Sequence, residues 1–238
     1  MPKKIRWGLL STAWINVAMV GPMHRSNRSE LVAVASRTLE KSRAFAVKNN
    51  IPKAYGNYEE LIEDPEVDVI YNPLPNTLHA EWTIRSVKAG KHVMCEKPMT
   101  TRAAQARELV HLAAAQRVHL LVPYGWHYKP FVQRAKELIE AGSIGKIEYV
   151  LCHMASPIRP LLSGAEVNLD DLSGQSSDSL FQPDASTWAD PLKADGGYGH
   201  AQLSHAAGLL FWLTDLEATH VFSTMSGPGA QVELYDAM

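Results

Sequence analysis

Cysteine is nearly absent from this chain of 238 residues, which has only Cys95 and Cys152 and no CxxC spacing. So few cysteines exclude a disulfide framework, and they favour a reducing, cytoplasmic environment. The ten histidines do not fall at the spacings of zinc ligands, so we expect no metal site.

Strong charge and long apolar runs are also absent. Lysine and arginine number 23 against 25 acidic residues, for a formal net charge of -2, which gives no sign of a nucleic-acid partner or a membrane-surface anchor. No run of 18 apolar residues occurs, so no membrane span is expected. Residues 7–20 loosely resemble a signal peptide, but Asn16 interrupts them and no A-x-A site follows.

The first part of the chain alternates short apolar runs with helical patterns. We expect strands at residues 5–10, 30–36, 67–71, 92–95 and 119–122, and helices at 15–24, 40–49, 58–63, 78–89 and 100–116. Thr100 or Thr101 is expected to cap the last of these helices. Strands that alternate with helices predict βαβ units and a parallel sheet, and uninterrupted apolar strands predict a sheet covered on both faces. The fold class is therefore α/β, with a Rossmann dinucleotide-binding domain over residues 1–122.

The pattern changes after residue 122. Helices are expected at residues 131–141 and 202–213 and strands at 147–154 and 217–224, while residues 155–195 predict a long loop rich in Ser, Asp, Pro and Gly. Residues 123–238 thus predict a partial α+β domain with an incomplete sheet, because two strands do not make a stable sheet face.

A turn of small residues follows the first strand. Gly8, Ser11, Thr12 and Ala13 do not match G-x-G-x-x-G, but a strand, a tight turn and a helix start occur in the right order. Small residues let the backbone approach a pyrophosphate, and a helix N-terminus offers free N–H groups. An ordinary βα turn explains these residues about equally well.

The end of the second strand carries Ser36 and Arg37 where an NAD site usually carries an acidic residue. A hydroxyl and a guanidinium suit the 2′-phosphate of NADP, so NADP is expected, with NAD as the alternative. The competing interpretation is a solvated arginine at a helix start.

Two further strand ends carry polar groups. Residues 73–79 form a proline-rich loop with Leu74, Asn76 and His79, in which Asn76 is expected to cap the next helix. Glu96, Lys97 and Pro98 follow the strand at 92–95. A lysine that is partly desolvated at the carboxyl edge of a sheet can exchange a proton with a hydroxyl, although a solvated Glu-Lys turn is commoner.

Together, residues 7–15, Ser36-Arg37, residues 73–79 and the segment Ala-Gly-Lys-His-Val-Met-Cys-Glu-Lys-Pro at 89–98 resemble the Gfo/Idh/MocA oxidoreductases. The resemblance covers essentially the whole chain and is strongest over residues 4–130. It implies a Rossmann domain followed by a domain with an open, mainly antiparallel sheet. It also implies hydride transfer between NAD(P) and a carbinol carbon of a sugar, polyol or diol. Lys97 matches the family's catalytic lysine, with Glu96 and Pro98 shaping the nicotinamide site.

The resemblance extends into the second domain. It places His205 at the family's catalytic histidine, with His200 as the rival. Ala201 stands where the family has aspartate, so either Gln202 partly substitutes for it or the chain belongs to a subgroup with altered proton handling. The segment after the sixth strand suggests substrate contacts, together with Gln202, at Tyr124, Trp126 and His127. The chain is shorter than usual members, so either it is a fragment or a partner completes its sheet, and a homo-oligomer formed through that sheet is expected.

The sequence therefore predicts a cytoplasmic NADP-dependent oxidoreductase, with a small sugar, polyol or diol as its substrate. Two alternatives remain open: a dinucleotide-binding regulatory or scaffold protein without turnover, and an inactive truncated member of the family.

Overall fold

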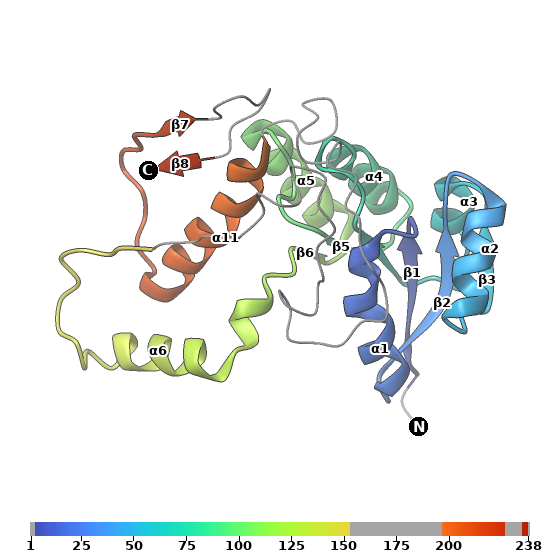
Figure 1. The fold of residues 1–238 in the computed structure, drawn as a ribbon, viewed down its shortest axis with the longest axis horizontal. Helices are drawn as coiled ribbons and strands as arrows, with labels where there is room; N and C mark the ends of the chain where they lie inside the picture. The colour runs from blue at the N-terminus through green and yellow to red at the C-terminus, as the bar shows by residue number, and fades with distance from the viewer. Residues whose placement is uncertain (1–2, 153–196, 227–234, 238) are drawn as a thin grey trace. The chain divides into compact units, whose positions relative to one another are not determined.

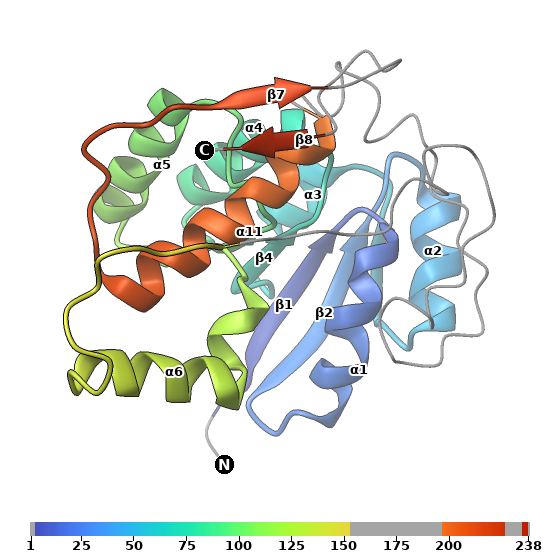
Figure 2. The same ribbon diagram turned by 60° about the vertical axis from the view of Figure 1, so that its left-hand side comes forward.

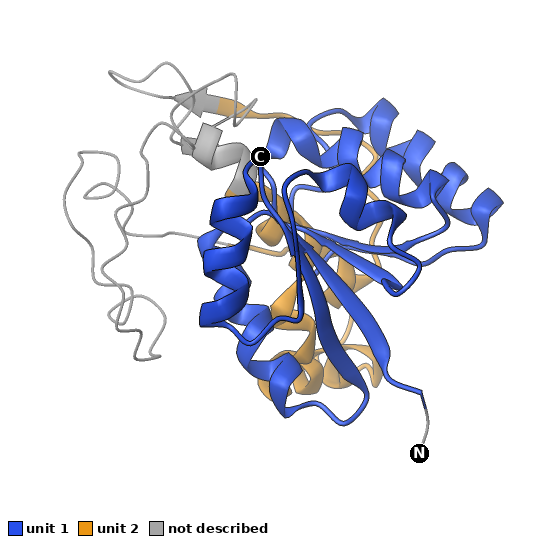
Figure 3. Ribbon diagram, turned by 90° about the vertical axis from the view of Figure 1, so that its right-hand side faces the viewer, with its two compact units in different colours: residues 1–123 blue, residues 124–238 orange. Residues whose placement is uncertain are grey.

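A computed structural model describes residues 3–152, 197–226 and 235–237. The loop expected at 155–195 lies outside these residues, as do residues 153–154, the last two of the strand expected at 147–154. The chain divides into two compact units, residues 1–123 and 124–238 (Figure 3). Each unit is described by itself.

Unit 1 is built around a parallel six-stranded sheet in the order β3-β2-β1-β4-β5-β6 (Figure 1). The strands are β1 (Ile5–Leu10), β2 (Ser29–Ala35), β3 (Lys53–Tyr55), β4 (Val69–Asn72), β5 (His92–Cys95) and β6 (Leu120–Leu121). This order is that of the Rossmann fold, with its topological switch point between β1 and β4. The expected α/β class and parallel sheet are confirmed.

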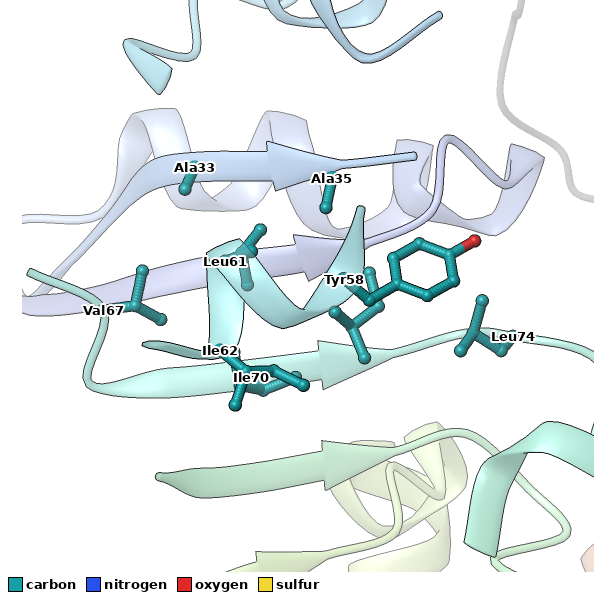
Figure 4. Close-up of a cluster of buried hydrophobic side chains, with 9 residues drawn as sticks. Ala33, Ala35, Tyr58, Leu61, Ile62, Val67, Ile70 and Leu74 are labelled. Carbon is teal, nitrogen blue, oxygen red and sulfur yellow. The ribbon is translucent and has the colours of Figure 1, made fainter. Parts of the chain in front are cut away.

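Helices cover both faces of this sheet. They are η1 (Trp14–Asn16), α1 (Val17–Arg25), α2 (Leu39–Lys48), α3 (Tyr58–Glu63), α4 (Asn76–Lys88) and α5 (Ala103–Gln116). Leu9 and Val34 pack with residues of α1 and α2, whereas Leu10, Ala33 and Ile70 pack with residues of α3 and α4. Figure 2 shows α1 and α2 beside β1 and β2, and Figure 4 shows the cluster around α3. Neighbouring residues of one strand thus enter opposite cores, which explains the uninterrupted apolar runs.

Three details of unit 1 differ from the expectations. The short β3 is a strand that was not expected, and its three residues carry only a weak apolar signal. Asn76 is the first residue of α4 rather than its cap, which is Pro75. Neither Thr100 nor Thr101 caps α5, because that helix begins at Ala103 after Arg102; the Thr100 hydroxyl instead donates to the Arg102 carbonyl at 2.9 Å.

Unit 2 contains η2 (Gly125–Tyr128), α6 (Pro130–Glu140), α11 (Gly197–Thr214), β7 (Thr224–Ser226) and β8 (Tyr235–Ala237). Two helices, α6 and α11, are joined by Lys136, whose Nζ donates to the Trp212 carbonyl at 2.7 Å and to Asp215 Oδ2 at 2.9 Å.

The strand predictions for unit 2 are wrong where the structure describes them. Residues 147–152 form no strand, and residues 217–223 form none before β7. Ile147, Tyr149 and Leu151 alternate with other residues as in a strand, but no neighbouring backbone pairs with them in the described part. In the described residues of unit 2, the only sheet is the antiparallel pair β7-β8. The large open sheet expected for this unit stays a prediction.

Candidate dinucleotide site at the carboxyl edge of the sheet

Four loops meet at one edge of the unit 1 sheet. Parallel register pairs Leu10 with Ala35, Leu9 with Tyr71, and Asn72 with Cys95. The chain segments that follow β1, β2, β4 and β5 therefore leave the sheet at the same edge. Ligands of open α/β sheets bind at this edge, close to the switch point.

The turn after β1 begins at Ser11, because Gly8 lies inside the strand. A Cβ at Gly8 would lie 2.7 Å from Leu61 Cδ2, so glycine allows the close packing of β1 against α3. Ser11 has the left-handed backbone conformation, with φ of 73°. Its hydroxyl accepts from the Ala13 N–H at 3.1 Å, and its carbonyl accepts from Asn16 Nδ2 at 2.8 Å.

The loop after β2 presents Ser36 and Arg37 at the same edge. Ser36 is buried, and its N–H donates to the Tyr55 carbonyl of β3 at 3.2 Å. Arg37 is exposed, and in the described part of the chain no carboxylate forms an ion pair with it. Thr38 then caps the N-terminus of α2, with its side chain accepting from the Lys41 N–H at 3.4 Å. This arrangement leaves a guanidinium available to an anion.

The loop after β4 is organised by Asn72, which is fully buried. Its Nδ2 donates to the His79 carbonyl at 3.2 Å and to Thr83 Oγ1 at 3.1 Å, and its Oδ1 accepts from the Leu74 N–H at 3.3 Å. These bonds fix the start of α4 against the end of β4. They hold Leu74 and His79 beside the lysine loop.

His79 connects α4 to the lysine loop. Its imidazole is 1% exposed, and Nδ1 donates to the Pro98 carbonyl at 2.6 Å. Burial lowers the pKa of His79, and the bond to the Pro98 carbonyl only partly opposes that effect. The ring is therefore neutral near pH 7, and it acts as an uncharged brace for residue 98.

The lysine corner follows β5. The Tyr71 hydroxyl, on β4, donates to Glu96 Oε1 at 2.8 Å, and the Lys97 N–H donates to Glu96 Oε2 at 3.2 Å. The Lys97–Pro98 peptide bond is cis. Burial lowers the pKa of the Lys97 amine, and the Glu96 charge partly opposes that shift. In the described residues no carboxylate forms an ion pair with Nζ, which suits proton exchange with a bound hydroxyl.

The residues predicted in the second unit form an aromatic cluster of their own. Tyr124 lies 5.5 Å from Trp126 and 5.7 Å from His205, between ring centroids, and Trp126 lies 3.9 Å from His127. Trp212 of α11 lies 4.9 Å from His127. Gln202 and His205 lie on α11 and are half-buried. The structure thus brings Tyr124, Trp126, His127 and His205 together, while their roles stay predictions.

Sequence reasoning missed three polar residues of the edge in unit 1. Tyr71 and Asn72 look like ordinary members of a buried strand, and Asn16 looks like a break in an apolar run. The one available signal is polarity: a side-chain amide inside an apolar segment needs hydrogen-bond partners, and these partners lie in the loops of the site.

Two features are absent from the described residues. No group of three or more His, Cys, Asp or Glu side chains is placed to hold a metal ion. Within the same residues, no helix has both the length and the apolar character needed to cross a bilayer.

Comparison with known proteins identifies relatives among oxidoreductases. The model of the oxidoreductase family with an NAD-binding Rossmann fold, GFO_IDH_MocA, matches residues 5–124. The chain is 34% identical over 166 residues to trans-1,2-dihydrobenzene-1,2-diol dehydrogenase of Xenopus laevis, covering 69% of this chain and 50% of that protein. It is 37% identical over 141 residues to D-xylose 1-dehydrogenase (NADP(+)) 2 of Haloferax volcanii, covering 59% and 43%.

Solved structures agree with this result. A 3-ketoreductase from Actinomadura kijaniata in complex with NADP has 32% identity and a TM-score of 0.56, covering 61% of this chain and 46% of that one. An aldose-aldose oxidoreductase from Caulobacter crescentus, at 23% identity, shares the fold with a TM-score of 0.73 over 97% of this chain and 65% of that one. The chain spans about half the length of the curated relatives it matches. The family match covers just over half of the chain and includes all four loops of the site, so the chain belongs to the Gfo/Idh/MocA oxidoreductase family.

Proposed function

We propose that this chain is an NADP-dependent oxidoreductase that transfers a hydride between nicotinamide and a carbinol carbon of a sugar, polyol or diol. One observation carries the proposal: a half-buried lysine with a lowered pKa lies at the carboxyl edge of a sheet with the Rossmann strand order. The relatives support the substrate class, because they are named for a diol, a pentose and a keto group.

The residues present fit a dinucleotide. The turn at Ser11, Thr12 and Ala13 leads into a helix N-terminus, which suits a pyrophosphate. Ser36 and Arg37 would hold the 2′-phosphate, and the edge around Leu74, Asn76, His79 and Pro98 would hold the nicotinamide half. The cofactor, when bound, supplies the hydride chemistry; the protein supplies binding and orientation.

Within this proposal Lys97 binds and polarises the reacting hydroxyl. A desolvated amine accepts a proton near neutral pH more readily than a solvated one, because burial disfavours its charged form. Glu96 limits that effect and holds the Lys97 backbone N–H. His205 is proposed to exchange the substrate's proton, with Tyr124, Trp126, His127 and Gln202 contacting the substrate.

Unit 2 is further proposed to carry an open antiparallel sheet through which copies of the chain assemble. Large apolar side chains are exposed in this unit, among them Tyr149 and Phe222 at 80% and Leu151 at 78%. Exposed apolar side chains favour association. Light scattering during size-exclusion chromatography tests this point, and a monomer at all concentrations would contradict it.

Titration of the intact chain with NADPH and NADH, followed by protein fluorescence, tests the cofactor assignment. We expect tighter binding of NADPH, and Arg37→Ala should weaken NADPH by roughly tenfold because one charge-assisted contact is lost, while NADH changes little. Arg43→Ala is the matched control, because it removes a different exposed arginine, one that lies on α2. Tighter NADH binding, or equal losses in both variants, would contradict the assignment.

A screen of carbinol substrates with the preferred cofactor then separates an enzyme from a binding protein. Reduction of the cofactor by at least one sugar, polyol or diol supports the proposal. Tight cofactor binding without turnover of any of them would favour a regulatory role instead.

A further inference from the structure

Ser11 has a backbone conformation that its residue type disfavours. Its φ of 73° lies in the left-handed region, which costs a residue with a Cβ atom but costs glycine little. The residue stands at the turn between β1 and η1, where a pyrophosphate would bind. Something in the fold must hold Ser11 there.

Asn16 supplies that restraint. Its Nδ2 donates to the Ser11 carbonyl at 2.8 Å, five residues back along the chain. The Ser11 hydroxyl completes the brace by accepting from the Ala13 N–H at 3.1 Å. The turn is thus closed by one side chain from each of its ends.

Because it is buried, the side-chain amide of Asn16 is destabilising at this position. The residue is 0% exposed, and in the described part of the chain its Oδ1 has no hydrogen-bond partner. A buried acceptor without a partner is destabilising, so an apolar side chain would serve packing better. The cost is explained if the bond from Nδ2 to Ser11 is needed by the site.

We propose that Asn16 is a positioning residue for the cofactor: it holds Ser11 in the left-handed conformation and so keeps the turn open to the pyrophosphate. This inference rests on the proposed function. Without the Asn16 donor, Ser11 spends most of its time in other conformations, and the apparent affinity falls with the fraction of competent turns.

A double-mutant cycle tests this mechanism. Asn16→Ala should raise the Kd of NADPH about tenfold, the order expected when a left-handed residue loses its restraint. Ser11→Gly is the second arm of the cycle: glycine adopts this conformation unaided, so the Kd of this single variant is the reference for the double variant. In the double variant, Ser11→Gly should restore most of the affinity that Asn16→Ala removes. A loss of packing at position 16 would not be rescued by glycine at a different residue.

Asn49→Ala is the matched control, because Asn49 Nδ2 also donates to a backbone carbonyl at 2.8 Å, that of Phe45 at the end of α2. It should lower the melting temperature without changing the Kd. Should Asn16→Ala not fold, Asn16→Ser gives the same comparison, since serine is too short to reach the Ser11 carbonyl.

The outcomes separate this inference from the proposed function. An unchanged Kd in Asn16→Ala, or a weakened Kd that Ser11→Gly does not rescue, overturns the role of Asn16 while leaving dinucleotide binding intact. If the unaltered chain binds neither NADPH nor NADH, the proposed function itself is overturned. Rescue confined to the Ser11 and Asn16 pair supports the inference.

Discussion

At the scale of single residues, the hydrogen bond between Tyr71 and Glu96 determines the electrostatic environment of Lys97. Tyr71 is 1% exposed, and its hydroxyl fixes one oxygen of the carboxylate whose other oxygen accepts from the Lys97 N–H. Burial and the Glu96 charge raise the pKa of Tyr71, so the phenol stays a donor at every working pH. The carboxylate is therefore held close to the lysine.

Tyr71→Phe should lower kcat on the order of tenfold with little change in the Kd of NADPH, because the lysine loop loses its support. The limb of the pH–rate profile that reports Lys97 should move to lower pH. The reason is that a less fixed Glu96 opposes the effect of burial on the pKa of Lys97 less strongly. Steady-state kinetics across pH measure both effects.

Tyr55→Phe is the matched control for this prediction, because the Tyr55 hydroxyl also donates to a carboxylate, Asp64 Oδ2, at 2.8 Å. Tyr55→Phe should lower the free energy of unfolding and leave the pH–rate profile unchanged. Equal shifts of the profile in the two variants would show that Tyr71 acts through general stability alone.

At the scale of elements, the contact between β1 and α3 explains why position 8 is glycine. An added Cβ would lie 2.7 Å from Leu61 Cδ2 and 3.1 Å from Val67 Cγ1, and both side chains are buried. Gly8→Ala should therefore reduce the free energy of unfolding by about 1–3 kcal/mol through overpacking.

Urea unfolding measures this change. Gly125→Ala is the control, since nothing lies within 4 Å of its added Cβ, and it should stay within about 0.5 kcal/mol of the parent chain. If both variants lose the same stability, helix packing is not what requires glycine at position 8.

The elements of unit 1 could be predicted because their local signals agree with the tertiary structure. The helix at residues 58–63 and the strand at 92–95 have the expected bounds, since a capped amphipathic helix and a buried strand leave clear patterns. The three residues of β3 could not be found, because that strand is specified by pairing with β2 rather than by its own composition. The strands expected at 147–154 and 217–224 are absent over residues 147–152 and 217–223 for the opposite reason: an apolar pattern permits a strand, but a strand forms only where a neighbouring backbone pairs with it.

The site was predictable where it depends on chain order, since the carboxyl ends of successive parallel strands must meet. Its braces were not predictable. Asn16, Tyr71 and Asn72 act through hydrogen bonds to residues in other segments or across a turn, and one sequence contains no record of such partners.

At the scale of the whole molecule, an ion pair at the sheet of unit 1 makes the stability of the folded chain depend on pH in the acid range. Arg6, on β1, donates to both carboxylate oxygens of Asp68, at 2.9 Å to Oδ2 and 2.6 Å to Oδ1. The Arg6 guanidinium lowers the pKa of Asp68 to about 2. An unfolded aspartate has a pKa of about 3.9. The pair therefore stabilises the folded chain above about pH 4, and that stability is lost as the pH falls toward 2.

Asp68→Asn should cost about 1 kcal/mol at neutral pH, a figure reduced for the partial exposure of the pair, and it should flatten the loss of stability between pH 4 and 2. Denaturant unfolding at several pH values measures this slope. Asp215→Asn alters an ion pair with Lys136 whose acidic side chain is 72% exposed, so its slope should stay near that of the parent chain. An unchanged slope in Asp68→Asn would contradict the assigned role of the pair.

The role of Lys97 is the central claim, and hydride transfer by Lys97→Ala compared with the parent chain tests it most directly. Cofactor binding and substrate oxidation are measured on the same samples, with Lys88→Ala, which alters an exposed lysine of α4, as the control. We expect Lys97→Ala to bind NADPH measurably while turnover falls by at least a hundredfold, since a positioned acid–base group contributes about that much or more. Full turnover in Lys97→Ala would contradict the account.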